Sequence, residues 1–373
     1  MRSAIILVCV LLNISMTGQH PILKAFGFRS LDDTIVHRDN GLAIVPLIYY
    51  TPDTRWAAGA SLVYYFSFTA RDSSEQDTRL SFIQTLADYT QNQQFDFWAT
   101  WSLFSRNESY LSKGEFRFRN FPDRFYGIGN ATTEDMMERY SYNLVSFKAL
   151  LMKKVARGWF VGGDFHLTRE YQFEFEPGGA LASGNILGAE NVNGVAVGAV
   201  VSNDTRDNVI NPYRGRLLEV STYQYLRQLG SSFNFLSIQS VAQWYTQVFP
   251  KHIIAIQYRG IFQFGDIPFL DLAMLGNDDL LRGYARNRFR DANFLGVQTE
   301  YRFPLYQRFG GVAFAGLGDV YNSSADISLQ TLKYSLGVGL RFLVDPAERL
   351  NIRFDVGFGR NSMAYYLMVT ESF

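Results

Sequence analysis

Apolar and polar residues alternate along this chain almost without a break from Gly41 to Phe373. Successive side chains of a β-strand point to opposite faces, so a period of two predicts strands with one apolar and one polar face. The apolar face of one such segment would hold Tyr334, Leu336, Val338, Leu340, Phe342 and Val344. Residues 350–359 repeat the pattern. The sequence therefore predicts an all-β fold in a single domain.

The surroundings of the apolar face decide between two β folds. A soluble sandwich buries that face, whereas a transmembrane antiparallel β-barrel turns it toward lipid. Apolar residues make up 47% of the chain and charged residues 19%, and no run in residues 41–373 is long enough for a membrane-spanning helix. The last strand ends on an aromatic residue, as strands of bacterial outer-membrane barrels do. Its predicted C-terminal barrel signal consists of Tyr365, Leu367, Val369 and Phe373.

The first residues resemble a secretory signal peptide. Met1 and Arg2 precede a short apolar stretch, and small and polar residues follow as far as Gly18. We expect residues 1–18 to be removed, residues 19–40 to form a periplasmic or lumenal lead-in, and residues 41–373 to form the barrel. Cys9 is the only cysteine and lies in the predicted signal peptide, which leaves no thiol for a disulfide or a cysteine-based metal site.

Sixteen segments have the pattern of a strand, and an even number is usual in single-chain bacterial barrels. They lie near residues 42–51, 55–68, 79–90, 94–104, 109–119, 139–153, 157–171, 192–203, 215–226, 233–247, 252–264, 293–303, 311–320, 332–344, 350–360 and 364–373. With both termini in the periplasm, the three longest links, 120–138, 172–191 and 265–292, all fall outside the cell. Short periplasmic turns and long outer loops are the expected arrangement.

The outer link 265–292 contains Leu281-Arg282-Gly283-Tyr284. This sequence resembles the [VLI]-R-G-[FY] motif of the sixth extracellular loop in the BamA/TamA outer-membrane assembly superfamily. The resemblance implies that the loop folds back into the lumen and that Arg282 pairs with a carboxylate on the barrel wall. The planar guanidinium suits such a partner, and glycine permits a close backbone approach or a positive φ. The predicted loop-arginine partner is Glu300. A solvated loop arginine is the alternative.

Other segments extend the resemblance over nearly the whole mature chain. They are residues 297–304, similar to the family's twelfth strand, 203–215, similar to its turn between strands eight and nine, 125–130, and 353–360. One departure is clear: the family's thirteenth strand usually carries F-x-D-x-G, and here Gly316 stands at the aspartate position. Asp319 has the opposite side-chain parity, so we do not expect it to join Arg282.

The space before the first predicted strand is too short for the periplasmic POTRA domains that usually precede such barrels. We therefore expect a POTRA-less member, whose assembly activity would depend on a partner or on the barrel alone. In the active mechanism, the seam between the first and last strands opens and its edges template an incoming strand. Pro46 removes one donor from the first strand. The parity of the last strand places Glu371 on the outer face near the periplasmic edge.

Other classes of function have little support. His166 and His252 fall on separate strands without ligand spacing, and the chain has no nucleophile elbow or phosphate loop. We expect no enzyme activity, cofactor or metal site, and a net charge of zero gives no reason to expect nucleic acid. The expected partners are outer-membrane lipid, possible periplasmic or outer-membrane assembly partners, and unknown client proteins. The sequence predicts assistance in protein insertion or translocation, with a passive pore or accessory envelope barrel as the alternative.

Overall fold

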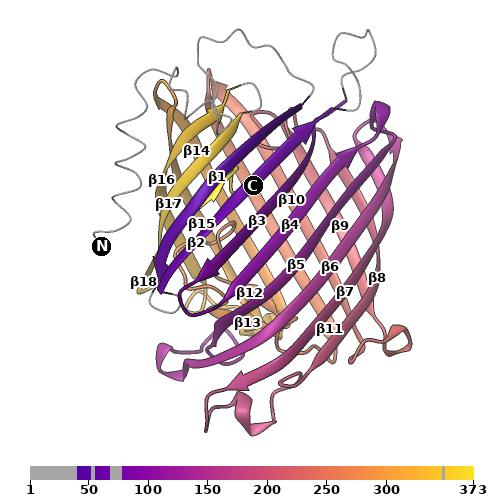
Figure 1. Cartoon of the computed structure of the whole chain (residues 1–373), viewed down its shortest axis with the longest axis vertical. Helices are drawn as coiled ribbons and strands as arrows, with labels where there is room; N and C mark the ends of the chain where they lie inside the picture. The colour runs from indigo at the N-terminus through magenta and orange to yellow at the C-terminus, as the bar shows by residue number, and fades with distance from the viewer. Residues whose placement is uncertain (1–39, 52–54, 68–77, 347–348) are drawn as a thin grey trace.

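The computed structural model describes residues 40–51, 55–67, 78–346 and 349–373. The predicted signal peptide and almost all of the lead-in lie outside these residues. One antiparallel sheet of sixteen strands accounts for most of the chain and curls into a transmembrane β-barrel (Figure 1). None of the described helices is long and apolar enough to cross a membrane.

Each strand of the large sheet pairs with its neighbour in sequence order, apart from one excursion between β11 and β14. The strands are β1 (Asn40–Thr51), β2 (Arg55–Phe66), β3 (Ser81–Thr90), β4 (Phe95–Phe104), β5 (Tyr110–Phe125), β6 (Glu138–Ala156), β7 (Trp159–Phe175), β8 (Val192–Asp204), β9 (Gly215–Tyr225), β10 (Phe235–Phe249), β11 (His252–Gly265), β14 (Asn293–Tyr306), β15 (Phe309–Tyr321), β16 (Lys333–Asp345), β17 (Leu350–Gly359) and β18 (Ser362–Val369). The excursion carries a small hairpin of β12 (Ala273–Leu275) and β13 (Phe289–Asp291).

The predicted count of sixteen strands in the large sheet is confirmed, although several strands differ from the prediction in extent. β5 continues to Phe125, six residues beyond its predicted end, because residues 120–125 still pair with residues 138–143 of β6. β18 ends at Val369, four residues before its predicted end. The hairpin β12–β13 was not predicted, since strands of three residues leave no usable periodicity.

The two faces of the strands have the orientation expected of a membrane barrel. On β16, the apolar Val338 is 59% exposed on the outside, whereas Ser335 on the other face is fully buried. The exposed apolar face continues around the molecule through residues such as Leu167, Val220 and Leu317. This distribution excludes the soluble sandwich, which would bury these side chains.

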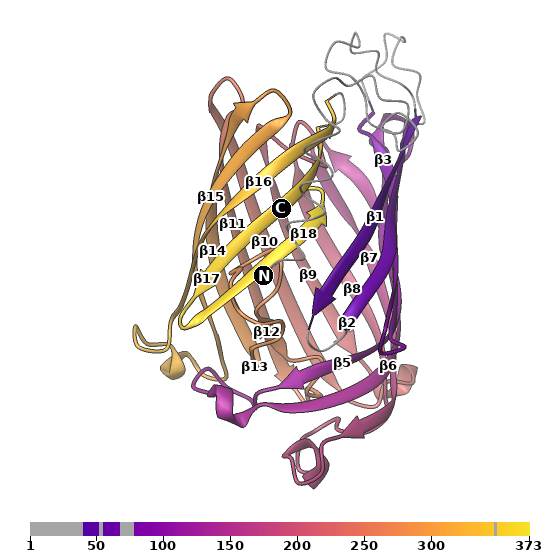
Figure 2. The ribbon, with the colours of Figure 1, turned by 60° about the vertical axis from the view of Figure 1, so that its left-hand side comes forward.

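Short turns gather at one end of the barrel and long loops at the other. The turns 157–158, 250–251 and 307–308 are the shortest at their end, and the links 126–137 and 266–292 belong to the opposite end. Following the usual arrangement in bacterial barrels, we assign the end with the short turns to the periplasm. In Figures 1 and 2 this end is at the top.

An apolar cap closes over the end with the long loops. β5, β6 and β7 project beyond their neighbours, and in Figure 2 the far ends of β5 and β6 run across the lower end of the ring of strands. The cap is a cluster of buried residues built on Phe125, Tyr140, Leu181, Phe269 and Leu272. Phe269 and Leu272 come from the link after β11, so this link is anchored to the cap before it turns inward.

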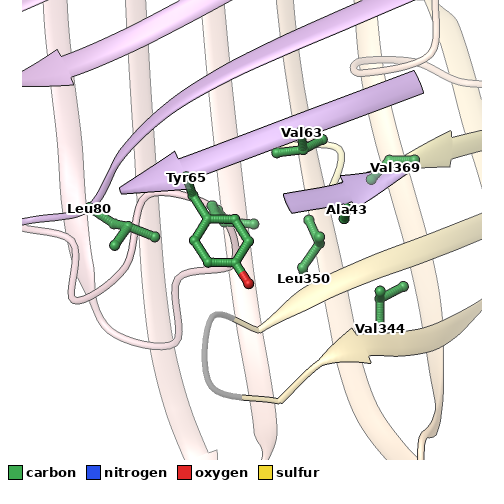
Figure 3. Packing of buried hydrophobic residues seen from close by; sticks show 8 residues of the cluster. Ala43, Val63, Tyr65, Leu80, Val344, Leu350 and Val369 are labelled. Atoms are coloured by element: carbon green, nitrogen blue, oxygen red, sulfur yellow. The ribbon is translucent and has the colours of Figure 1, made fainter. Parts of the chain in front are cut away.

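β1 and β18 stand at the two ends of the hydrogen-bonded order of the sheet. Figure 2 looks between them, with strands of the far wall visible behind. Near the periplasmic end, Ala43 of β1 and Val369 of β18 belong to one buried apolar cluster, together with Val63, Tyr65 and Leu350 (Figure 3). We call this cluster the seam cluster, and it links the two edge strands at this end through side-chain packing.

Candidate functional site

The segment 276–288 between β12 and β13 carries the predicted motif into the interior of the barrel. Leu281 has a φ of +58° and Gly283 a φ of +123°. A Cβ placed on Gly283 would lie 2.7 Å from the backbone nitrogen of Phe358, so only glycine lets this turn approach β17 so closely. The positive φ and the close approach are the two properties expected of this glycine.

Arg282 is completely buried and reaches two strands of the wall. Its guanidinium donates to Glu300 of β14 through one nitrogen and to Asp355 of β17 through the other. The guanidinium carbon lies 3.6 Å from the ring centroid of Phe314 on β15. The hydroxyl of Ser335 donates to the backbone oxygen of Arg282. A buried cation is costly unless it is paired and hydrogen-bonded, and the two terminal nitrogens of Arg282 are both paired and hydrogen-bonded.

Sequence reasoning missed Asp355 as a partner of Arg282. The sequence predicted Glu300 as the principal partner, because Gly316 stands where the family pattern places an aspartate on β15. A Cβ at Gly318 would lie 2.6 Å from Leu281 Cδ1, so the glycines of β15 make room for Leu281. The alternation of β17 puts Asp355 on the polar face and was the available signal. As expected, Asp319 stays apart from Arg282, and its carboxylate pairs with Lys333 at 3.1 Å.

The other motif residues also contact the wall. The amide of Leu281 donates to Gln298 Oε1 on β14 over 3.2 Å. The hydroxyl of Tyr284 donates to the backbone oxygen of Tyr334 over 2.8 Å and accepts from the amide of Arg360. The motif thus contacts β14, β16 and the end of β17 together, which fixes the height of the loop in the lumen.

Further arginines extend the ion pairs along the inner wall. Arg302 contacts Glu300 at 2.9 Å, Arg341 contacts Asp355 at 2.5 Å, and Arg353 contacts Asp355 at 2.9 Å. We call these three residues, together with Arg282, Glu300, Asp355 and Glu371, the lumen network. Because neighbouring members share their partners, removing one member leaves other buried charges uncompensated.

The C-terminal residues turn into the lumen and join this network. After Val369 the chain bends at Thr370, whose φ is +78°. The Glu371 carboxylate accepts from Arg341 Nε at 2.7 Å and from Asn351 Nδ2 at 2.6 Å. The predicted place of Glu371 on the outer face is therefore wrong, because the strand parity that predicted it ends where the strand ends.

Phe373 also lies inside rather than on the strand face. Its backbone oxygen accepts from Arg302 Nη2 at 2.9 Å, and the Arg302 guanidinium carbon lies 5.3 Å from its ring centroid. Ser372 donates to the backbone oxygen of Asp279 over 2.8 Å, so the tail (residues 370–373) touches the docked loop directly. Tyr365 and Leu367 are on the outer surface, and Val369 is in the seam cluster.

The described residues offer no metal centre. Among them, no group of three or more histidine, cysteine, aspartate or glutamate side chains is arranged to hold an ion. The chemistry available at this site is ion pairing, hydrogen bonding and backbone pairing along strand edges.

Fold and site together define a class: transmembrane β-barrels in which a long loop returns to the lumen and docks through an arginine. The model of the Omp85 superfamily domain matches residues 39–365, and the chain belongs to the Omp85 superfamily. This confirms the resemblance to the BamA/TamA barrels that the motifs indicated. Members of this superfamily are outer-membrane barrels concerned with protein insertion or translocation.

Comparison with solved structures gives the same fold. The crystal structure of BamA from Haemophilus ducreyi lacking POTRA domains 1–3 superposes with a TM-score of 0.55 at 10% sequence identity, over 90% of this chain and 70% of that one. At this identity the likeness concerns the fold alone. No curated protein matches the chain.

Proposed function

We propose that this barrel resides in the bacterial outer membrane and assists the insertion or translocation of other proteins there. The observation that carries the proposal is the arrangement of the sheet's two ends. β1 is twelve residues long and β18 only eight, and the residues that would have lengthened β18 are held in the lumen by arginines instead. The edge of β1 that faces the seam is thereby available to an incoming strand.

The proposed chemistry is backbone pairing. In the membrane interior, an unpaired N–H or C=O costs several kcal/mol, so a strand edge there favours any segment that can complete its hydrogen bonds. An unfolded outer-membrane protein supplies such segments, and strand addition requires no cofactor or covalent step. Clients are therefore proteins with amphipathic β-strands, which the barrel receives from periplasmic or outer-membrane partners.

The docked loop supports this function over a passive pore. Arg282 and its partners hold the segment 276–284 across the inner wall, and the apolar cap covers the outer end of the lumen. A wide, steady channel needs an open lumen. For the wild-type protein in planar bilayers we expect small, flickering conductance that becomes large when residues 277–290 are deleted. Large, steady conductance that the deletion leaves unchanged would identify a passive pore.

The direct test is to lock the seam. Ala43→Cys and Val369→Cys introduce thiols into the seam cluster, and a short bis-maleimide can join them. We expect the cross-linked protein, reconstituted in liposomes, to lose its acceleration of the folding of a urea-unfolded eight-stranded barrel, followed by heat-modifiable migration on gels. Acceleration by the locked protein equal to that of the wild type would contradict the seam mechanism.

Two controls make the test specific. The same double variant without cross-linker should retain activity, which shows that the substitutions alone are harmless. Tyr301→Cys with Ala313→Cys places thiols on β14 and β15, whose residues 301 and 313 are already paired. Cross-linking this second pair restrains strands that have no need to separate, so activity should persist.

A further inference from the structure

The lipid-facing surface has a hollow at its periplasmic rim, between β4, β5 and β6. Its volume is about 450 Å³. The lining residues are Leu103, Ser105, Arg106, Tyr110, Ser112 and Leu151. Leu151 is 59% exposed and Tyr110 48% exposed, both on the outer face. The hollow therefore opens toward lipid and is distinct from the lumen network.

Small residues and a ring held at one side create this hollow. Trp101 lies against Gly114 on the neighbouring strand, where an added Cβ would be 2.0 Å from the ring. The indole N–H donates to the hydroxyl of Ser112 over 3.1 Å, which fixes the ring. The hydroxyl of Ser105 accepts from the amide of Tyr110 over 2.8 Å. Both serine hydroxyls are thus engaged in the wall, and the open space is bounded mainly by carbon.

Two basic side chains lie beside the hollow, and the carboxylate closest in sequence to Arg106 is paired elsewhere. Arg106 is part of its lining, and Lys153 lies on β6 directly opposite Tyr110 with its side chain exposed. Within the described residues, neither side chain has a hydrogen bond or an ion pair. The nearby Glu108 points to the other side of the wall, where Arg79 contacts it at 2.9 Å and Lys154 at 3.7 Å. Two unpaired cations therefore remain on the outer face.

We propose that this hollow binds an anionic phospholipid. The headgroup phosphate is held by Arg106 and Lys153, and an acyl chain lies along Leu103, Tyr110 and Leu151. Cations at the rim of a barrel attract anionic headgroups, and the apolar hollow beside them distinguishes a lipid from a free anion. Its depth also fits, because the headgroup would lie level with the periplasmic turn and the chain would extend toward the membrane interior. The inference does not depend on the insertion activity proposed above.

Native mass spectrometry of the full-length protein, released from detergent micelles, tests the site. The probes are dioleoyl phosphatidylglycerol, the zwitterionic dioleoyl phosphatidylethanolamine, and glycerol 3-phosphate as a soluble headgroup. We expect tight retention of phosphatidylglycerol and weak retention of the other two. The double variant Arg106→Gln, Lys153→Gln should weaken phosphatidylglycerol binding about thirtyfold, since each basic side chain contributes roughly fivefold.

Two more variants separate headgroup from chain. Lys251→Gln removes a cation from the periplasmic turn between β10 and β11, outside the lining of the hollow, and should leave binding unchanged. Leu151→Gln should lower phosphatidylglycerol binding without changing the weak binding of glycerol 3-phosphate. All variants are surface changes, and heat-modifiable migration verifies that they fold. Equal losses in the Lys251 variant and the double variant, or glycerol 3-phosphate binding as tight as that of the lipid, would overturn the proposal.

Discussion

One link, residues 266–292, is held at two places by different kinds of interaction. Near Phe269 it joins the cap through aromatic rings, which lie 5.7 Å from Phe125 and 5.6 Å from Tyr140, measured between centroids. At Arg282 it joins the wall of β14 and β17 through buried ion pairs. Apolar packing is non-directional and tolerates small shifts, whereas the guanidinium requires its two carboxylates in fixed places. The cap thus retains the link, and the lumen network sets its position.

The largest loss of stability is expected when the ion pairs that hold the link at Arg282 are broken. Asp355→Ala removes the acid shared by Arg282, Arg341 and Arg353, which should destabilise the folded barrel by about 3–5 kcal/mol because the cations stay buried. The urea midpoint for loss of heat-modifiable migration measures this change. Asp278→Ala is the matched control, because its side chain is 43% exposed and, among the described residues, forms an ion pair with Arg353 alone. Similar midpoints for the two variants would show that the network is not a stabilising unit.

Removing the apolar contacts of Phe269 in the cap should cost a comparable free energy, but the loss of structure should be confined to the cap. Phe269→Ala removes a fully buried ring from the cap, at a cost of about 3 kcal/mol in packing. We expect the links of the cap to become sensitive to protease added outside, while the urea midpoint of the barrel wall changes little. Leu187→Ala changes an exposed apolar residue of the neighbouring link and is the control. Global unfolding of the Phe269 variant would mean that cap and wall form one cooperative unit.

The smallest of the three effects should come from the tail. Glu371→Gln keeps the shape of the side chain but weakens its contacts with Arg341 and Asn351, at a cost of about 1–2 kcal/mol. We expect a nitroxide label at position 373 to become more mobile, while Arg282 keeps its own partners and the loop stays docked. Ser328→Ala, in an exposed link, provides the control for the label. An unchanged spectrum would show that Arg302 and Ser372 hold the tail without the carboxylate.

The sequence located much of this site. The resemblance to the family's twelfth strand pointed to Glu300 as the partner of Arg282, and the Gly283 position fitted a turn that only glycine can make. Asp355 and the lumenal position of Glu371 were missed for one reason. Periodicity tells which face of a strand a residue occupies, but it says neither which strands a loop will reach nor where a strand stops. Both depend on contacts between residues far apart in the chain.

By itself, the sequence determined the all-β fold, the sixteen strands of the large sheet, the face that side chains within those strands occupy and the membership of a family, because these follow from a local period of two and from short motifs. The tertiary structure alone decided that β14 and β17 both supply carboxylates to Arg282, that the tail lies among arginines, and that outward cations flank a hollow at the rim. The physical reason is that curling of the sheet brings distant strands together around the lumen, and the burial there makes every unpaired charge costly.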